Sequence, residues 1–245
     1  MKAGVWFHSS PTYNQGFTFM VLRLAFDENR SQVPKLILKV RDGSVPLMRF
    51  EVEDSCRRLG LDGIDVAQLV SMDPRPGNLV DQLRQGGGPL AEELASLRDR
   101  GLVRQTVLFL NQENSDAAVE AAATSDLIDG VTLYWNAFQR DCSDAAWAAI
   151  QEKAIPVLAL RTLGGGPSDK ACSANPVAWA ALLKAADCRD ATEFNLRLAA
   201  SEPAVRTTIG GTASLAHLEE YLECATDALP LPEDILNGVT RLRVG

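Results

Sequence analysis

Short apolar runs rich in Val, Ile and Leu alternate with segments of helical period along nearly the whole chain, and this alternation constrains the fold most. It is typical of parallel βα units whose strands are buried on both faces. We expect seven strands, at residues 5–8, 36–40, 64–70, 106–111, 130–135, 156–161 and 206–210. Helices are expected at residues 17–27, 48–59, 90–99, 115–125, 144–153, 176–186, 191–199, 215–225 and 232–242.

Sustained alternation over 245 residues favours a single α/β domain, at residues 1–245, of the TIM-type (β/α) barrel class. An open doubly wound sheet is the alternative, but such a sheet more often carries a glycine fingerprint after its first strand. A closed barrel of this type has eight strands, so seven strands leave parallel edges unpaired. We therefore expect an incomplete barrel, with a second copy or a partner chain covering the open edge. Residues 74–88, rich in Pro and Gly, are expected to form a loop.

Composition and charge exclude several classes of function. The chain has 32 acidic and 24 basic side chains, and the net charge of −8 disfavours nucleic-acid binding. No apolar stretch approaches the roughly 20 residues needed to cross a bilayer, and no signal-peptide pattern is present, so we expect a cytoplasmic protein. Two histidines and five cysteines lack the spacings of metal sites and disulfide frameworks. The cysteines are expected to be buried free thiols.

Four segments match motifs of one known family. Residues 52–65 (VEDSCRRLGLDGID) are similar to S-L-x-x-L-G-x-D-x-I-D, and residues 101–104 (GLVR), followed by a strand ending in Asn111, to G-L-V-R-x-I-G-V-S-N. Residues 156–166 (PVLALRTLGGG) are similar to a strand ending in Y-S-P-L-x-x-G, and residues 203–222 to P-x-V-x-x-x-I-x-G-x-x-S-x-x-H-L-x-E-N. The chain therefore resembles the aldo/keto reductase superfamily from Gly4 to Leu242. Residues 4–13 resemble the family's second strand, so its first strand and helix have no counterpart here.

This resemblance implies an NAD(P)H-dependent carbonyl reductase whose catalytic tyrosine is tuned by a lysine and a histidine, with an aspartate supporting the lysine. Tyr13 falls on the tyrosine, and Lys39 falls on the lysine. His8 stands at the aspartate, so the lysine loses its anionic partner. Val70 stands at the histidine, so a hydrogen-bond donor to the carbonyl oxygen is lost as well. His8 is a candidate to take over part of that role.

The resemblance also implies an NADP site, although several of its positions have changed. The candidate cofactor-binding residues are Asn111, Arg161, Thr212 and Ser214. Leu160 replaces the aromatic residue that stacks on the nicotinamide in the family. The basic and amide positions near the adenosine fall on Gly211, His217 and Tyr221, which supply no strong cation for a 2′-phosphate. We therefore expect weak NADP binding or none.

Two classes of function stay open. In one, the chain is an active NAD(P)H-dependent oxidoreductase that uses Tyr13 and Lys39 on a small carbonyl substrate. In the other, hydride transfer is abandoned, and the chain is a pseudoenzyme of the family, a non-redox lyase or cyclase, or a regulatory binding subunit. The replaced positions serve different parts of one reaction, and they are His8, Val70, Leu160, Gly211 and His217. Their joint replacement favours weakened or lost reduction, with a small-molecule ligand at the barrel mouth.

Overall fold

The computed structural model describes residues 6–70, 76–164 and 176–244. Contacts between residues divide the chain into two compact units. The N-terminal unit contains residues 3–110 and 114–131, and the C-terminal unit contains residues 111–113 and 132–245. Within the described residues, no helix is long and apolar enough to span a bilayer.

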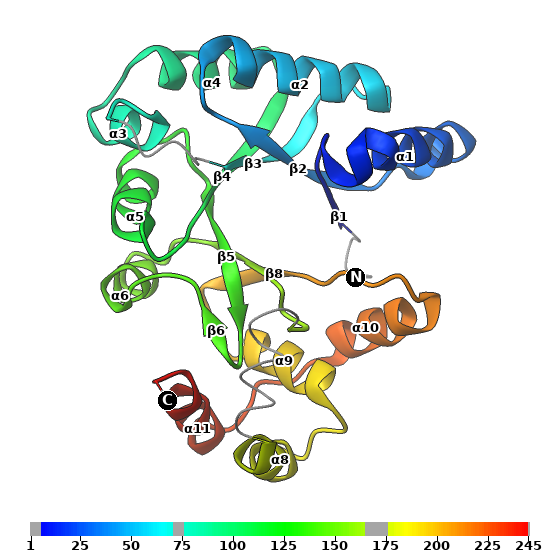
Figure 1. Ribbon diagram of the computed structural model, residues 1–245, viewed down its shortest axis with the longest axis vertical. Helices are drawn as coiled ribbons and strands as arrows, with labels where there is room; N and C mark the ends of the chain where they lie inside the picture. The colour runs from blue at the N-terminus through cyan, green and yellow to red at the C-terminus, as the bar shows by residue number, and fades with distance from the viewer. Residues whose placement is uncertain (1–5, 71–75, 165–175, 245) are drawn as a thin grey trace. The chain divides into compact units, whose positions relative to one another are not determined.

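The N-terminal unit is built on parallel strands in the order β1-β2-β3-β4 (Figure 1). These strands are β1 (Trp6–Ser9), β2 (Lys35–Arg41), β3 (Ile64–Val70) and β4 (Val103–Phe109). Its helices are α1 (Phe17–Glu28), α2 (Val45–Leu59), α3 (Leu79–Arg84), α4 (Pro89–Asp99) and α5 (Ser115–Thr124), with the short 3-10 helices η1 (Tyr13–Gly16) and η2 (Arg30–Gln32).

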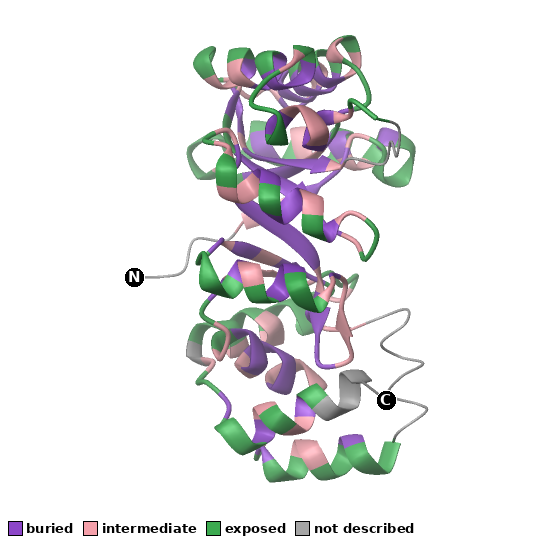
Figure 2. Ribbon diagram, turned by 90° about the vertical axis from the view of Figure 1, so that its left-hand side faces the viewer, coloured by how far each residue is buried: buried purple, intermediate pink, exposed green. Residues whose placement is uncertain are grey.

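Local sequence signals explain where these elements begin and end. The Ser44 hydroxyl accepts a hydrogen bond from the Leu47 amide and caps α2 at its N-terminus. Gly60 ends the same helix with a φ of 67°, a left-handed conformation that glycine adopts without a steric penalty. In β2, Leu36, Ile37 and Leu38 are each at most 2% exposed, so the strand is buried on both faces. Figure 2 shows the same pattern, with buried residues concentrated in the strands.

The C-terminal unit holds most of β5 (Gly130–Asn136), which pairs with the two-residue antiparallel strand β6 (Gln139–Arg140). It also holds β7 (Val157–Leu160) and β8 (Val205–Ile209), which pair in parallel. Its helices are α6 (Asp144–Glu152), α8 (Pro176–Ala185), α9 (Ala191–Ala200), α10 (Leu215–Asp227) and α11 (Glu233–Val244).

The predicted fold class is confirmed, because the chain forms an α/β barrel of the TIM type that is incomplete, with seven parallel strands in its described residues. Several bounds differ from the prediction by a few residues, and some details of the prediction were wrong. Asn78 caps an unpredicted helix, α3, within residues 74–88, where we expected only a loop. The strand β4 begins at Val103 rather than at residue 106, and the strand β6 was missed. The assignment of residues 1–245 to one domain stays a prediction.

Candidate functional site

The predicted catalytic side chains Tyr13, Lys39 and His8 lie together in the N-terminal unit. His8 is on β1, Lys39 is on β2, and Tyr13 begins η1 just after β1. The Lys39 Nζ lies 5.0 Å from the centroid of the Tyr13 ring, in a cation–π arrangement. The rings of His8 and Tyr13 meet edge to face, with 6.1 Å between their centroids. The structure therefore forms one cluster from these residues, while their catalytic roles stay predictions.

The turn that follows β1 positions Tyr13 through an unusual backbone. Asn14 and Gln15 both have positive φ angles, of 48° and 55°. Non-glycine residues adopt this region at a cost, and such residues are enriched at functional sites. The Tyr13 amide donates a hydrogen bond to the Ser10 carbonyl at 3.1 Å. The Arg58 Nη2 donates to the Gly16 carbonyl at 2.9 Å, so α2 holds the end of this turn.

Gln68 on β3 belongs to the same cluster, although the sequence analysis missed it. Its Oε1 lies 2.6 Å from the Nε2 of His8, and because an amide oxygen only accepts, His8 donates this bond. Burial lowers the pKa of His8, the hydrogen bond to Gln68 acts in the opposite direction, and the charge of Lys39 lowers it further. His8 is therefore neutral at pH 7. A polar residue in the middle of the buried strand IDVAQLV was the signal that could have identified Gln68.

Lys39 is a cation without a nearby carboxylate among the described residues of this cluster. Among the described residues, no carboxylate lies within ion-pair distance of Lys39. The neutral His8 stands where the resemblance implies an aspartate, and it does not supply the missing negative charge. Val70, at the end of β3, is half-buried and offers no side-chain donor. The cluster can therefore attract negative charge, but its imidazole N–H is already committed to Gln68.

A second polar group lies in the C-terminal unit at the ends of β5 and β7. The guanidinium of Arg161 lies 4.0 Å from the centroid of the Tyr134 ring. Arg161 has a φ of 54°, and its carbonyl accepts a hydrogen bond from the buried Asn136 Nδ2 at 3.0 Å. Burial raises the pKa of Asp141, while a backbone hydrogen bond from Gln112 and the charge of Arg161 act to lower it. Tyr134 and Asp141 were not among the predicted site residues.

The remaining candidate cofactor residues are largely engaged within their own loops. The Asn111 Oδ1 accepts a hydrogen bond from the Glu113 amide at 3.0 Å. The Thr212 hydroxyl accepts from the Ser214 amide at 3.1 Å, and the Ser214 hydroxyl accepts from the amide of residue 217 at 3.4 Å and caps α10. Their roles in cofactor binding stay predictions.

These residues do not fit the NADP that the resemblance implies. Leu160, at the position where the resemblance implies an aromatic that stacks on the nicotinamide, is 6% exposed, and the next residue, Arg161, is stacked on Tyr134. The hydroxyls of Thr212 and Ser214 accept hydrogen bonds from backbone amides at the start of α10, and residues 210–217 contain no lysine or arginine for a 2′-phosphate. The described part of the chain also contains no cluster of His, Cys, Asp and Glu side chains that could hold a metal ion.

A hollow of about 340 Å³ in the N-terminal unit lies away from the catalytic candidates. It is lined by residues at the amino ends of β2, β3 and β4, including Lys35, Asp65 and Arg104. Asp65 pairs with Arg104 and also accepts a hydrogen bond from the Leu36 amide at 3.0 Å. Active sites of barrels of this type lie at the carboxyl ends of the strands. We therefore assign these amino-end contacts to stability.

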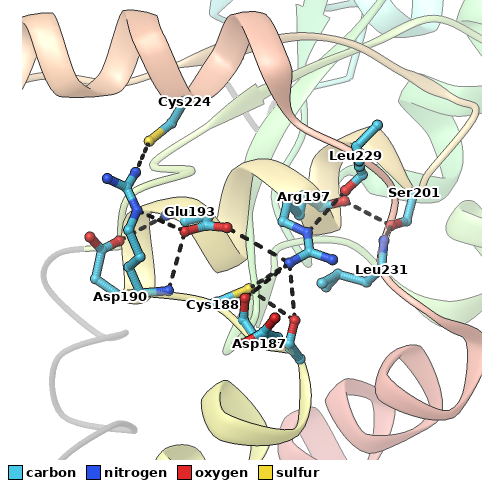
Figure 3. A network of polar contacts seen from close by, with 11 residues as sticks. Asp187, Cys188, Asp190, Glu193, Arg197, Ser201, Cys224, Leu229 and Leu231 are labelled. Carbon is cyan, nitrogen blue, oxygen red and sulfur yellow. Dashed lines mark hydrogen bonds and ion pairs between the residues drawn. The ribbon is translucent and has the colours of Figure 1, made fainter.

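Two half-buried cysteines take part in a polar network between α9 and α10 (Figure 3). The Arg189 Nη2 lies 2.8 Å from the Cys224 sulfur, and the Arg197 Nη1 lies 3.3 Å from the Cys188 sulfur. Glu193 joins the two arginines at 3.0 Å and 3.7 Å. Burial raises the pKa of both thiols, which therefore stay protonated.

The expectation of buried free thiols is confirmed for Cys56 and Cys142. It is wrong in part for Cys188 and Cys224, which are free but only half-buried. Cys172 lies outside the described residues.

Comparisons with solved structures return aldo-keto reductases. An NADPH complex from Klebsiella pneumoniae matches with a TM-score of 0.74 at 20% identity, over 98% of this chain and 80% of that one. A holo enzyme from Bacillus halodurans gives 0.72 at 20% identity over 97% and 81% of the chains. A thermostable enzyme in complex with the inhibitor epalrestat gives 0.73 at 18% identity over 96% and 81%.

No protein-family model and no curated protein matches the sequence. The structural matches confirm the resemblance to aldo-keto reductases at the level of the fold.

Proposed function

We propose that this chain is an aldo-keto reductase-fold protein that binds a small molecule at Tyr13, Lys39 and His8, and that NAD(P)H-dependent carbonyl reduction is lost or strongly weakened. The observation that carries the proposal is the pairing within this cluster. Lys39 lies over the face of the Tyr13 ring and has no carboxylate beside it among the described residues. His8 donates its Nε2 proton to Gln68.

The chemistry of carbonyl reduction makes this pairing unfavourable. A phenol has a pKa near 10, so it protonates a carbonyl oxygen efficiently only when a cation stabilises the phenolate oxygen. Among the described residues, Tyr13 and Lys39 make no hydrogen bond, and their contact is with the ring face. A carbonyl oxygen also needs a second donor as its negative charge develops. The N–H of His8 points to Gln68 instead.

The cofactor residues support the same proposal. The position where the resemblance implies a stacking aromatic holds the buried Leu160, and Arg161 is packed on Tyr134. The hydroxyls of Thr212 and Ser214 accept backbone hydrogen bonds at the start of α10, and no lysine or arginine occurs within residues 210–217 to hold a 2′-phosphate. The structural neighbour from Klebsiella pneumoniae was solved in complex with NADPH.

A turnover assay tests the proposal. The purified protein is incubated with NADPH or NADH and a panel of small aldehydes and ketones, and loss of the reduced cofactor is followed. We expect the unaltered protein to show the same rate as Tyr13→Phe, because Tyr13 no longer transfers a proton in a reductive step. Phe50→Leu is the control, since Phe50 is an exposed side chain on α2 that belongs to no candidate site. Turnover that Tyr13→Phe abolishes and Phe50→Leu keeps would overturn the proposal.

Retained reduction is the second candidate, and one observation favours it. Lys39 on β2 meets His8 on β1 and Tyr13 in the following turn in one cluster. In that case the chain is an active NAD(P)H-dependent oxidoreductase on a small carbonyl substrate. The assay with Tyr13→Phe separates the two candidates. A non-redox lyase or cyclase, or a regulatory binding subunit, is compatible with the first candidate, because each needs a ligand but no hydride.

A further inference from the structure

Two hydrogen-bond donors without acceptors lie side by side on neighbouring strands of the N-terminal unit. Lys39 on β2 and Gln68 on β3 are direct register partners, so their side chains leave the sheet on the same face and at the same level. Gln68 is 1% exposed, and its Nε2 is buried with no hydrogen-bond partner among the described residues. Lys39 is half-buried and contacts the Tyr13 ring without an ion pair in the same described part of the chain.

Both features are unfavourable unless an acceptor arrives. A buried amide N–H without a partner costs about 1–3 kcal/mol in desolvation. A half-buried ammonium is usually paired, because a carboxylate offsets the loss of water around the charge. The chain as a whole carries a net charge of −8, so carboxylates are abundant, yet among the described residues none pairs with Lys39. Both the Lys39 ammonium and the Gln68 NH₂ therefore lack an acceptor, and a negatively charged acceptor would satisfy both.

Among the described residues, the groups in contact with these donors add no negative charge. His8 is neutral and uses the Oε1 of Gln68, which leaves the amide NH₂ of Gln68 as the group without a partner. Tyr13, 37% exposed, lies next to Lys39 at the rim. The cluster therefore combines one cation, one buried amide NH₂ and one phenol.

We infer that Lys39 and Gln68 together bind a small monocarboxylate, one oxygen of which takes the Lys39 ammonium and the other the Gln68 NH₂. The inference deepens the proposed function by naming the ligand class of its site, but it does not depend on the loss of carbonyl reduction. A carboxylate fits because its two oxygens match two donors from adjacent strands. A phosphate, with more charge and more oxygens, is normally held by arginines or by several backbone amides, which the cluster does not supply.

A titration with propionate tests the inference on the full chain. Propionamide has nearly the same shape but no charge, and sodium chloride keeps the ionic strength constant. The assigned side-chain amide signal of Gln68 is followed by NMR. We expect this signal to move to saturation with propionate and not with propionamide. No shift with propionate, or equal shifts with both compounds, would overturn the inference.

Variants sharpen the same experiment. Lys39→Met removes the cation, and Gln68→Glu keeps an oxygen for His8 but replaces the NH₂ with a second acceptor. We expect each to weaken propionate binding at least tenfold, measured by calorimetry. Lys35→Met is the matched control, because Lys35 lies on the same strand, 5.0 Å from the centroid of the Trp6 ring. We expect it to change affinity less than twofold, and an equal loss in Lys35→Met would contradict the inference.

The outcome is separable from that of the proposed function. Propionate is added without NADPH, so binding is measured whether or not hydride transfer occurs. Binding together with NADPH turnover in the separate assay would sustain this inference and overturn the proposed function. No propionate binding together with no NADPH turnover would overturn this inference and sustain the proposed loss of carbonyl reduction. If a variant fails to fold, the Gln68 signal of the unaltered protein still decides the question.

Discussion

An imidazole next to Lys39, in place of the carboxylate that the resemblance implies, changes the charge of the cluster by one unit. The pKa of His8 is lowered by burial and by the charge of Lys39, while its hydrogen bond to Gln68 acts in the opposite direction. With His8 neutral, the Lys39 ammonium is left without the negative charge of the aspartate that the resemblance implies. Under the proposed function, this single replacement favours binding of an anion by the cluster and disfavours stabilisation of a phenolate by Lys39.

The titration of His8 gives the first prediction. We expect the pKa of His8 to lie below 6.5, because burial disfavours its charged form. Lys39→Met should raise this pKa by removing a repelling charge, and Gln68→Leu should lower it by removing a bond that favours the charged form. NMR titration of the His8 ring in the three proteins measures both changes. A pKa at or above 6.5 in the unaltered protein, or shifts of the same sign in both variants, would disprove the assignment.

The same shift has a consequence for stability. The folded-state pKa of His8 is lower than its unfolded value, so protonation of His8 favours the unfolded state. The free energy of unfolding therefore keeps its full value above pH 6.5 and decreases as the pH falls through the folded-state pKa. We expect the free energy of unfolding to decrease from pH 7.5 to pH 5.5, and to decrease less in His8→Gln, which has no titrating ring. Urea unfolding at the two pH values measures this difference. An equal decrease in both proteins would assign the pH dependence to other groups.

At the scale of elements, leucines on strands and helices differ in how far they are buried, and so in their expected contribution to stability. Leu38 on β2 is fully buried, whereas Leu24 on α1 is 64% exposed. Leu38→Ala should therefore cost about 2–5 kcal/mol of unfolding free energy, because it leaves a cavity. Leu24→Ala should stay within about 0.5 kcal/mol. Urea unfolding of both variants makes the comparison, and similar losses would mean that α1 is covered in solution.

The packing of α2 against α4 contains an ion pair with a defined pH dependence. The Arg49 Nε donates to the Glu93 carboxylate at 2.9 Å, and this bond is the main cause of the lowered pKa of Glu93. Its stabilisation is therefore present above pH 4.5 and lost as the pH falls through the folded-state pKa. Glu93→Gln should lower the urea midpoint at pH 7 and change it little at pH 3. A midpoint equal to that of the unaltered protein at pH 7 would show that the pair contributes nothing.

Strand positions were largely predictable from the sequence, because buried parallel strands are continuous apolar runs. The bounds of β3 agree with the prediction, and α2 ends at Leu59 as predicted. The six-residue helix α3, which Asn78 caps, was missed because it lies in a segment rich in proline and glycine, a composition that predicts a loop. Gln68 was missed because register between strands, and not sequence spacing, brings it next to Lys39 and His8. Side-chain pairing of this kind cannot be read from one strand.

At the scale of the whole molecule, the fold is that of the aldo-keto reductases, while the loss of carbonyl reduction is a proposal. The chain matches enzymes such as the Klebsiella pneumoniae aldo-keto reductase over nearly its full length, at 20% identity. A barrel fold supports many chemistries, because function depends on the residues at the strand ends and not on the scaffold. Retention of the fold is therefore compatible with loss of the reduction.

The expected second copy or partner chain also belongs to this scale, and it stays a prediction. Four residues on one face of α1 are each more than half exposed, and they are Phe17, Met20, Val21 and Leu24. Apolar side chains spaced in this way usually pack against another surface. We expect light scattering at tens of micromolar to give a mass above the 26.5 kDa of one chain, and Leu24→Lys to reduce it. A monomer under these conditions would remove the prediction, and Leu215→Lys on α10 is the control.

Binding of the reduced cofactor tests the central claim most directly. NADPH and NADH are titrated into the purified protein and followed by fluorescence and calorimetry. The account predicts no saturable binding up to millimolar concentration, because Leu160 stands where the resemblance implies an aromatic that stacks on the nicotinamide, and residues 210–217 contain no lysine or arginine for a phosphate. Micromolar binding of either cofactor, worth about −8 kcal/mol, would contradict it and would restore the active oxidoreductase as the leading function.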